Sequence, residues 1–204
     1  MTLDAEQEGR RSQAERRAAT VGKVLDAALA SFAQVGYART TIGRVSELSG
    51  VSQGGLARYF PSRLDLMVAA AEQVLVVDRA AFTARAGRPG VTTLELLRLL
   101  REMCRSPLNG AWYELLAASR TDVELRERLA PLGARLTRHV TGLAAGLPGL
   151  QHLPDTQRQT MLVSVIYLFD GEALAAQVHP HPEQEEARLH LAVALIESAA
   201  VVPA

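Results

Sequence analysis

The stretch of residues 40–63 constrains the fold of this chain more than any other part of the sequence. It has the pattern of two short helical segments separated by a tight turn at Gly50, and glycine readily adopts the left-handed conformation that ends a helix. Thr40 or Thr41 can cap the first segment with a side-chain oxygen, and Ser52 can cap the second. This layout is typical of a helix-turn-helix, in which the second helix enters the major groove of DNA.

The spacing of apolar residues predicts which side of each segment is buried. The apolar positions recur at helical intervals and are Ile42, Val45 and Leu48 in the first segment, and Leu56 and Phe60 in the second. The positions left facing outward on the second segment are Gln53, Gly54, Gly55, Ala57 and Arg58. Small residues allow close approach to the major groove, and Gln and Arg side chains can make bidentate contacts to base edges. The sequence therefore predicts DNA binding.

The charge distribution agrees with this prediction, although the formal net charge of the whole chain is zero. Residues 9–65 contain nine basic side chains (Arg10, Arg11, Arg16, Arg17, Lys23, Arg39, Arg44, Arg58 and Arg63) and four acidic ones (Glu15, Asp26, Glu47 and Asp65). From residue 66 onward there are 13 basic and 15 acidic side chains. The basic excess is local, and a local patch is what contact with phosphates requires.

The residues around this motif resemble a known family. The stretch from about Arg16 to Val74 is similar to the N-terminal domain of the TetR family of bacterial transcriptional regulators. The matching landmarks are Gly36, Tyr37, Thr40, Thr41, Ile42, Gly50, Val51, Ser52, Leu56, Tyr59, Phe60, Pro61, Ser62, Arg63 and Leu66.

Two positions depart from the pattern of that family. The family usually has Thr where Gly55 stands, and an aromatic residue, most often Tyr, where Ala57 stands. Both family residues commonly touch DNA, so the resemblance implies operator contacts that are fewer or differently placed. Arg63 replaces the usual Lys and keeps its positive charge.

The resemblance implies phosphate contacts for three residues, Thr41, Tyr59 and Arg63. Gln53 and Arg58 are the predicted base readers. Arg44 fits a phosphate contact and a solvated surface charge equally well. The full predicted set of DNA-contacting residues is Thr40, Thr41, Arg44, Ser52, Gln53, Gly54, Gly55, Arg58, Tyr59 and Arg63.

Helical periodicity continues along the chain, and no alternating strand pattern or internal repeat appears. We therefore predict an all-α fold, with an N-terminal three-helix helix-turn-helix domain and a C-terminal helical domain for ligand binding and dimerisation. The predicted organisation is a disordered arm at 1–14, the DNA-binding domain at 15–63, a connecting helix at 63–86 and the effector-binding and dimerisation domain at 87–204. Further helices are expected at about 92–105, 112–119, 122–145, 155–178 and 183–201, with loops at 87–90, 106–110, 146–154 and 179–182.

Several aromatic and sulfur-containing side chains of the C-terminal part fit either a ligand cavity or an ordinary core. The candidate ligand-binding residues are Met103, Cys104, Trp112, Tyr113, Tyr167 and Asp170. Asp170 and Glu172 are acidic groups within an apolar helix, where they can meet a cationic or hydrogen-bonding ligand or form salt bridges.

The last two expected helices carry more apolar surface than one core needs. We therefore predict a two-fold homodimer in which these helices pair with their copies, with Ile166, Leu174, Val193 and Ile196 in the interface. The resemblance implies the same arrangement. Gly171 lies mid-helix, where it would permit close approach of another helix.

The sequence does not favour a disulfide, a membrane span, a metal site or an enzyme. Cys104 is the only cysteine, which excludes an intramolecular disulfide and suits a reducing cytoplasm. There is no signal peptide pattern, and no apolar run approaches the roughly 18 residues of a membrane span. His179 and His181 lack supporting ligand spacing, so we predict no metal and no cofactor. A Gly-rich phosphate loop and a Gly-x-Ser-x-Gly elbow are absent, which argues against an enzyme.

Together these expectations describe a repressor that binds a palindromic operator as a homodimer and is released by a small, largely apolar effector. The expected partners are double-stranded operator DNA, that effector and a second copy of the chain. The expected location is the bacterial cytoplasm, at the nucleoid when the protein is bound to DNA. The alternative is a DNA-binding regulator without a small-molecule ligand.

Overall fold

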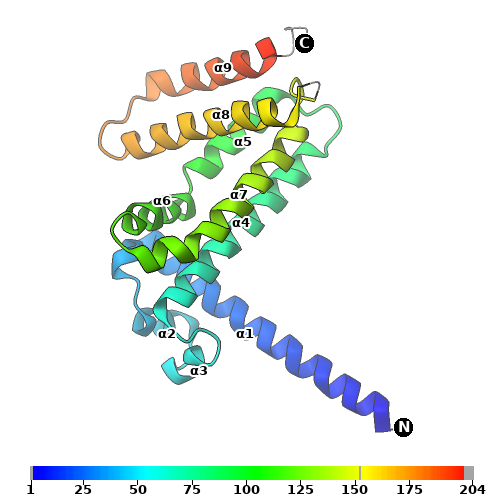
Figure 1. Cartoon of the computed structure of the whole chain (residues 1–204), viewed down its shortest axis with the longest axis vertical. Helices are drawn as coiled ribbons and strands as arrows, with labels where there is room; N and C mark the ends of the chain where they lie inside the picture. The colour runs from blue at the N-terminus through cyan, green and yellow to red at the C-terminus, as the bar shows by residue number, and fades with distance from the viewer. Residues whose placement is uncertain (1, 152, 200–204) are drawn as a thin grey trace. The chain divides into compact units, whose positions relative to one another are not determined.

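The computed structural model of the chain describes residues 2–151 and 153–199. These residues form nine helices and no strand, so the predicted all-α fold is confirmed (Figure 1). The chain divides into two compact units, residues 1–73 and 74–204. The division falls within α4, which spans Arg63–Ala86, and not in a loop. The predicted domain limits at residues 63 and 87 stay predictions.

The N-terminal unit consists of three helices and the first part of α4. The three helices are α1 (Thr2–Arg39), α2 (Ile42–Ser49) and α3 (Gln53–Ala57). α1 is interrupted at Gly36, where the backbone has φ 75° and ψ 174°. Glycine holds this positive φ without a steric penalty because it has no Cβ. Gly36 therefore ends the regular part of α1.

The start of α1 differs from the sequence prediction. The segment 1–14 was expected to be a disordered arm, but the helix begins at Thr2. The physical reason is composition, since Ala, Glu, Gln and Arg make up most of this segment and all four are good helix formers.

The core of the N-terminal unit joins α1 to the two short helices. Its most buried side chains include Ala28, Phe32, Val45, Leu56, Leu66 and Met67. Leu48 was predicted to be buried but is 45% exposed. Because α2 is only eight residues long, the stripe that it packs against α1 and α3 is narrow and centres on Val45.

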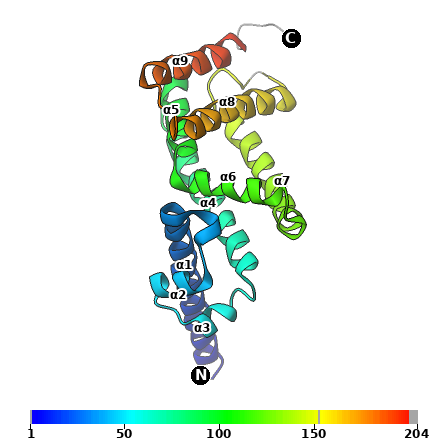
Figure 2. The same cartoon turned by 90° about the vertical axis from the view of Figure 1, so that its left-hand side faces the viewer.

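The C-terminal unit contains the second part of α4 and five further helices. They are α5 (Thr93–Cys104), α6 (Pro107–Ser119), α7 (Val123–Ala145), α8 (Asp155–Ala176) and α9 (Pro182–Ala199). α8 packs on α7, and α5 packs against both α8 and α9 (Figure 2). α6 packs on α7 and touches α5. The interior is apolar and includes Phe82, Leu96, Leu97, Leu147, Leu150, Leu162, Phe169, Leu189 and Ile196.

Helix starts in this unit follow capping chemistry. Thr92 and Glu95 form a capping box at α5, and the side chain of Asp122 caps α7. α6 begins at Pro107, although residues 106–110 were expected to be a loop and the helix was expected from Trp112. The Ser106 hydroxyl accepts from the backbone N–H of Asn109 at 3.1 Å, and proline suits the first helical position.

Candidate nucleic-acid interface and effector site

The turn between α2 and α3 is fixed by backbone conformation and by small polar side chains. Gly50 has φ 69° and donates its N–H to the carbonyl of Ser46 at 3.0 Å. The Ser46 hydroxyl donates to the carbonyl of Val51 at 2.7 Å. At the start of α3, Ser52 accepts from the N–H of Gly55 at 3.2 Å. These bonds set the direction in which α3 leaves the turn.

The cap of the first motif helix is also settled by the structure. Thr41 accepts from the N–H of Arg44 at 3.2 Å and is the N-cap of α2. The side chain of Thr40 is instead fully buried. Its hydroxyl donates to the carbonyl of Gly36 at 2.8 Å and lies 2.9 Å from the hydroxyl of Ser31. Thr40 was predicted to bind DNA, but in the structure its hydroxyl joins two parts of the core.

The predicted reading face of α3 is exposed. Gln53, Gly54, Ala57 and Arg58 all lie at the surface of the N-terminal unit. Within the described residues, the side chains of Gln53 and Arg58 form no hydrogen bond or ion pair, so both are available to base edges. The geometry suits their predicted role as base readers.

The two glycines of α3 differ in the space around them. A Cβ added at Gly54 would meet nothing within 4 Å. A Cβ added at Gly55 would lie 3.0 Å from Cγ1 of Val51 and 3.3 Å from Oγ of Ser52. Gly55 thus faces the turn and is only partly exposed, whereas the sequence pattern had placed it outward. A Thr at this position, as in the family pattern, would require the side chains of Val51 and Ser52 to move by a few tenths of an ångström.

Arg63 is bound within the N-terminal unit. Its Nε donates to the carbonyl of Thr40 at 2.8 Å, and its Nη2 donates to the carbonyl of Tyr37 at 2.5 Å. The guanidinium also lies over the ring of Tyr37, at 4.4 Å from the ring centroid. These contacts join the start of α4 to the connection between α1 and α2. A phosphate contact by Arg63 stays a prediction, and it would have to use the remaining donors of the group.

Two further cations lie close to the motif. Arg44 donates from Nη2 to Oε1 of Gln34 at 2.7 Å, so it is tethered to α1 and is not a freely solvated charge. The guanidinium carbon of Arg17 lies 5.6 Å from the centroid of the half-buried Tyr59 ring. Sequence reasoning did not single out Arg17, because only the fold brings α1 beside the end of α3. The predicted phosphate contact of Tyr59 stays a prediction.

A buried carboxylate lies between α6 and α8 in the C-terminal unit. Asp170 is only 4% exposed and accepts from Nδ2 of Asn109 at 2.8 Å and from the hydroxyl of Tyr113. Asn109 also donates to the carbonyl of Cys104 at 2.8 Å, which adds the end of α5 to the group. Burial and the neighbouring carboxylate of Asp170 raise the pKa of Tyr113, so its hydroxyl stays protonated and keeps donating.

The structure therefore brings three predicted ligand-binding residues together, Cys104, Tyr113 and Asp170. Asn109 belongs to the same group and was missed, because the segment that holds it was expected to be a loop. Met103 is partly buried against the core, and Trp112 is also partly buried. Tyr167 is 67% exposed. Ligand binding by these residues stays a prediction.

Glu172 lies two residues beyond Asp170 on α8 and is paired with three arginines. Its carboxylate lies 2.6 Å from Arg105, 3.3 Å from Arg188 and 3.9 Å from Arg101. Arg105 also pairs with Glu185 at 2.8 Å. The cluster ties α5, α8 and α9 together. Of the two roles considered for Glu172, ligand contact and salt bridge, the structure contains the salt bridge.

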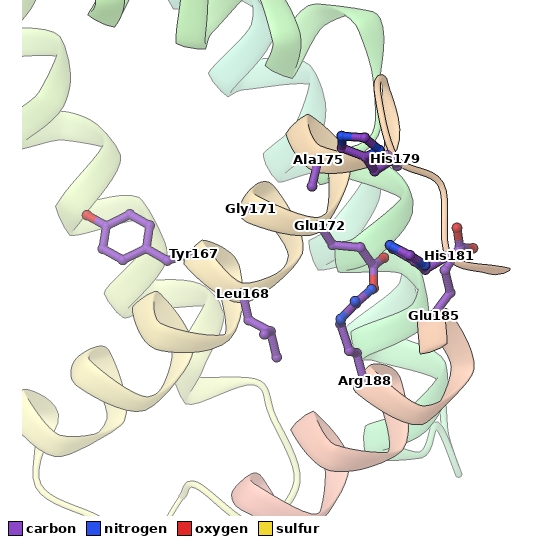
Figure 3. Close-up of a pocket in the computed structure, with 10 residues that line it drawn as sticks. Tyr167, Leu168, Gly171, Glu172, Ala175, His179, His181, Glu185 and Arg188 are labelled. Atoms are coloured by element: carbon purple, nitrogen blue, oxygen red, sulfur yellow. The ribbon is translucent and has the colours of Figure 1, made fainter. Parts of the chain in front are cut away.

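A groove lies between the end of α8 and the start of α9. Its volume is about 310 Å³. It is lined by Tyr167, Leu168, Gly171, Glu172, Ala175, Ala176, His179, His181, Glu185 and Arg188. Figure 3 shows Glu172 and Arg188 meeting at one side of this groove, with His181 and Glu185 beyond them. Of the six predicted ligand-binding residues, only Tyr167 lines it.

The four predicted interface residues differ in how deeply they are buried in the single chain. Ile196 is completely buried in the core of its own chain, so its assignment to a dimer interface is wrong. The helical pattern could not distinguish a side facing α5 from a side facing a partner. Ile166 and Val193 are partly buried against the core, and Leu174 is 45% exposed. The large apolar side chains exposed on α8, on α9 and just beyond the end of α8 are Tyr167, Leu174, Val178, Leu191 and Leu195.

The described residues contain no group of three or more His, Cys, Asp or Glu side chains arranged to hold a metal ion. None of the helices that they form combines the length and apolar character needed to cross a membrane.

Comparisons with known proteins agree with this geometry. The family described as bacterial regulatory proteins, tetR family, matches residues 24–70. The HTH-type transcriptional regulator Rv2912c of Mycobacterium tuberculosis is 33% identical over 191 residues, which cover 91% of this chain and 97% of that protein. The structure of the multidrug binding protein EbrR complexed with imidazole has a TM-score of 0.61 and 26% identity, covering 90% of this chain and 96% of that one. A transcriptional regulator from Rhodococcus has the same fold, with a TM-score of 0.66 and 20% identity over 90% of this chain and 99% of its own. The chain therefore belongs to the TetR family of bacterial transcriptional regulators.

Proposed function

We propose that this regulator is a repressor that binds a palindromic operator as a homodimer and is released by a small, largely apolar effector. The observation that carries the DNA-binding part is the exposed face of α3, where the side chains of Gln53 and Arg58 are held by no other described residue. Phosphate contacts by Thr41 and Tyr59 beside this face would orient the helix on the duplex.

The homodimer is supported by the apolar surface of the last two helices. Tyr167, Leu174, Leu191 and Leu195 are each between 45% and 67% exposed on α8 and α9. Burial of these large apolar side chains against a second copy would be favourable. A two-fold dimer through this surface would present two α3 helices to half-sites about one helical turn of DNA apart, roughly 34–36 Å. A palindromic operator follows from that symmetry.

The effector is supported by the polar group of Asn109, Tyr113 and Asp170 inside an otherwise apolar helical unit. EbrR, which has the same fold, is a multidrug binding protein and has been solved with ethidium. A ligand that binds this group would favour one conformation of the unit. Coupling of about 1–3 kcal/mol is typical of allostery and would weaken operator binding several-fold to about 100-fold. The regulator would act in the cytoplasm, at the nucleoid.

The test begins with selection of bound genomic fragments by the purified protein, followed by footprinting of the enriched site. A symmetric footprint with two half-sites one helical turn apart is expected, together with lower transcription from the adjacent promoter. Metabolites that raise Tm would then be added to the protein–operator complex. Release by at least one of them supports the proposal, whereas operator affinity that no bound compound changes would support a regulator without a ligand.

A further inference from the structure

Two buried carboxylates on α8 are partnered in opposite ways. Glu172 is 6% exposed and lies within 4 Å of three arginine side chains. Asp170 is 4% exposed, and its partners among the described residues are Asn109 and Tyr113, both of which are uncharged. The described part of the chain therefore supplies arginines to one carboxylate of α8, Glu172, but none to the other, Asp170.

A buried carboxylate without a cation is costly. Moving a charge out of water is strongly unfavourable, and hydrogen bonds from neutral donors offset only part of that cost. An ionised carboxylate has about four acceptor positions. Asn109 and Tyr113 each occupy one of them in the structure, so acceptor positions remain on both oxygens of Asp170. A cation that reached Asp170 would gain charge-assisted hydrogen bonds and would neutralise the charge.

The surroundings of Asp170 also suit a cation. Tyr113 is only partly buried, and Tyr167, on the same helix as Asp170, is 67% exposed. Tyr113 donates to Asp170, and Tyr167 lies three residues before Asp170 on α8, so both rings are neighbours of the carboxylate. Tyrosine rings attract organic cations through their faces. Because Tyr113 and Tyr167 reach the surface, rearrangement of these two side chains would open a path to the carboxylate.

We propose that Asp170 is the counter-ion for a positively charged group of the effector, which is then an organic cation with an apolar body. This inference rests on the proposed function, since it assumes that the C-terminal unit binds an effector, and it narrows the chemical class of that effector. The cation would occupy the open acceptor positions of Asp170 beside the ring of Tyr113. Asn109 also holds the carbonyl of Cys104, so a cation that displaced it would loosen a link between α5, α6 and α8.

The test compares three probes of the same size and different charge: phenethylammonium, phenethyl alcohol and phenylacetate. Their binding to the full-length protein is measured by ligand-observed NMR and by thermal shift. We expect the cation to bind about 10-fold or more tightly than the alcohol, and the anion to bind least, because only the cation gains a charge-assisted bond to Asp170. Equal affinity for the three probes, or no detectable binding of the cation, would overturn the proposal.

Two variants test whether the charge of Asp170 causes the preference for the cation. Asp170→Asn removes the charge at nearly constant size and should reduce affinity for phenethylammonium about 10-fold, while affinity for phenethyl alcohol stays unchanged. Glu172→Gln is the matched control, since it removes a buried carboxylate from the same helix. It should lower Tm but leave cation affinity within about twofold. If Glu172→Gln does not fold, Glu102→Gln at an exposed position on α5 serves as the control. An equal loss of cation affinity in Asp170→Asn and in the control would refute the role of Asp170.

The same titrations separate this inference from the function on which it rests. Operator affinity is measured in the presence of each probe. Binding of the cation through Asp170 without any change in operator affinity would contradict the proposed ligand-released repressor and leave the cation site standing. Operator release by neutral or anionic compounds alone would support the repressor and refute the cation site.

Discussion

At the scale of single residues, the N-terminal unit shows what a sequence pattern can and cannot specify. The caps at Thr41 and Ser52 and the left-handed Gly50 are confirmed, because they depend on residues no more than four apart in sequence. Thr40 is buried instead, because its hydroxyl lies against that of Ser31, nine residues earlier on α1. Arg63 is held by carbonyls 23 and 26 residues away, which no local pattern encodes.

The base-reading assignment predicts the effect of truncating Arg58. Arg58→Ala should weaken binding to the specific operator by about 1–3 kcal/mol and relax preference at one base position, because bidentate contacts to a base edge would be lost. Competition binding against operators with single base changes measures both quantities. Arg88→Ala, an exposed arginine of the C-terminal unit, is the control. Unchanged affinity and unchanged base preference in Arg58→Ala would show that this residue does not read DNA.

The contacts of Arg63 predict a different outcome from that of a simple phosphate contact. Arg63→Ala should lower the free energy of unfolding by about 1–3 kcal/mol, because two carbonyls lose a charged donor and the Tyr37 ring loses its stacked cation. Arg39→Ala removes one exposed hydrogen bond to the carbonyl of Val35 and should change the free energy of unfolding much less. Denaturation gives the stability, and the salt dependence of DNA binding tests the phosphate contact. A salt slope reduced by about one unit with stability unchanged would assign Arg63 to phosphate alone.

At the scale of helices and their junctions, the pattern located most elements of the C-terminal unit but not their contacts. The apolar periodicity placed α5, α7, α8 and α9 within a few residues of their observed ends. It missed the start of α6, where Ser106 and Pro107 were read as a break instead of a cap and a first turn. It also could not foresee that Glu172 meets arginines from both α5 and α9, since partners far apart in sequence depend on how the helices pack.

The arginine cluster predicts the cost of removing its central carboxylate. Glu172→Ala should destabilise the C-terminal unit by about 3–5 kcal/mol, because Arg101, Arg105 and Arg188 would be left close together without their shared partner. Calorimetric unfolding measures the change. Glu183→Ala, at an exposed position near the start of α9, should have little effect. Equal stability of the two variants would mean that the cluster does not hold α5, α8 and α9 together.

The capping box of α5 predicts a dependence of stability on acid. Hydrogen bonds from the backbone and side chain of Thr92 hold the pKa of Glu95 below its ordinary value of 4.5. A carboxyl with a lowered pKa in the folded state stabilises the protein above the ordinary pKa, and that contribution disappears as the pH falls through the lowered pKa. Glu95→Gln keeps the capping geometry without the charge, so its Tm should fall less than that of the wild type across this acidic range. Parallel Tm curves for the two proteins would contradict the prediction.

At the scale of the whole molecule, the family and the all-α fold were predictable, but assembly was only partly so. The excess of apolar residues on the last two helices was visible in sequence, and four large apolar side chains are exposed on them in the single chain. The pattern could not sort those residues from Ile196, which fills the core of its own chain. Both kinds of position are apolar and recur at helical spacing, so only the packing distinguishes them.

This difference gives a direct test of the proposed dimer. Leu195→Glu places a charge at a side chain that is 45% exposed in the single chain, so it should give a folded monomer. Ile196→Glu places the charge at a fully buried position, where it costs several kcal/mol, and should unfold the C-terminal unit. Light scattering gives the mass, and circular dichroism gives the helicity. A wild-type monomer at micromolar concentration would exclude the dimer, and a dimeric Leu195→Glu would place the interface elsewhere.

The unequal surroundings of the two adjacent glycines in α3 bear on how this regulator could diverge after gene duplication. Gly54 has free space beyond its Cα, so a copy of the gene could acquire a side chain there in a single mutational step and keep its fold. Such a step would also favour the helix, because glycine is the poorest helix former after proline. A Cβ at Gly55 would instead crowd the side chains of Val51 and Ser52, which would have to move by a few tenths of an ångström. A new side chain at Gly54 therefore requires less adjustment of the turn, and position 54 is the easier route to a changed operator preference.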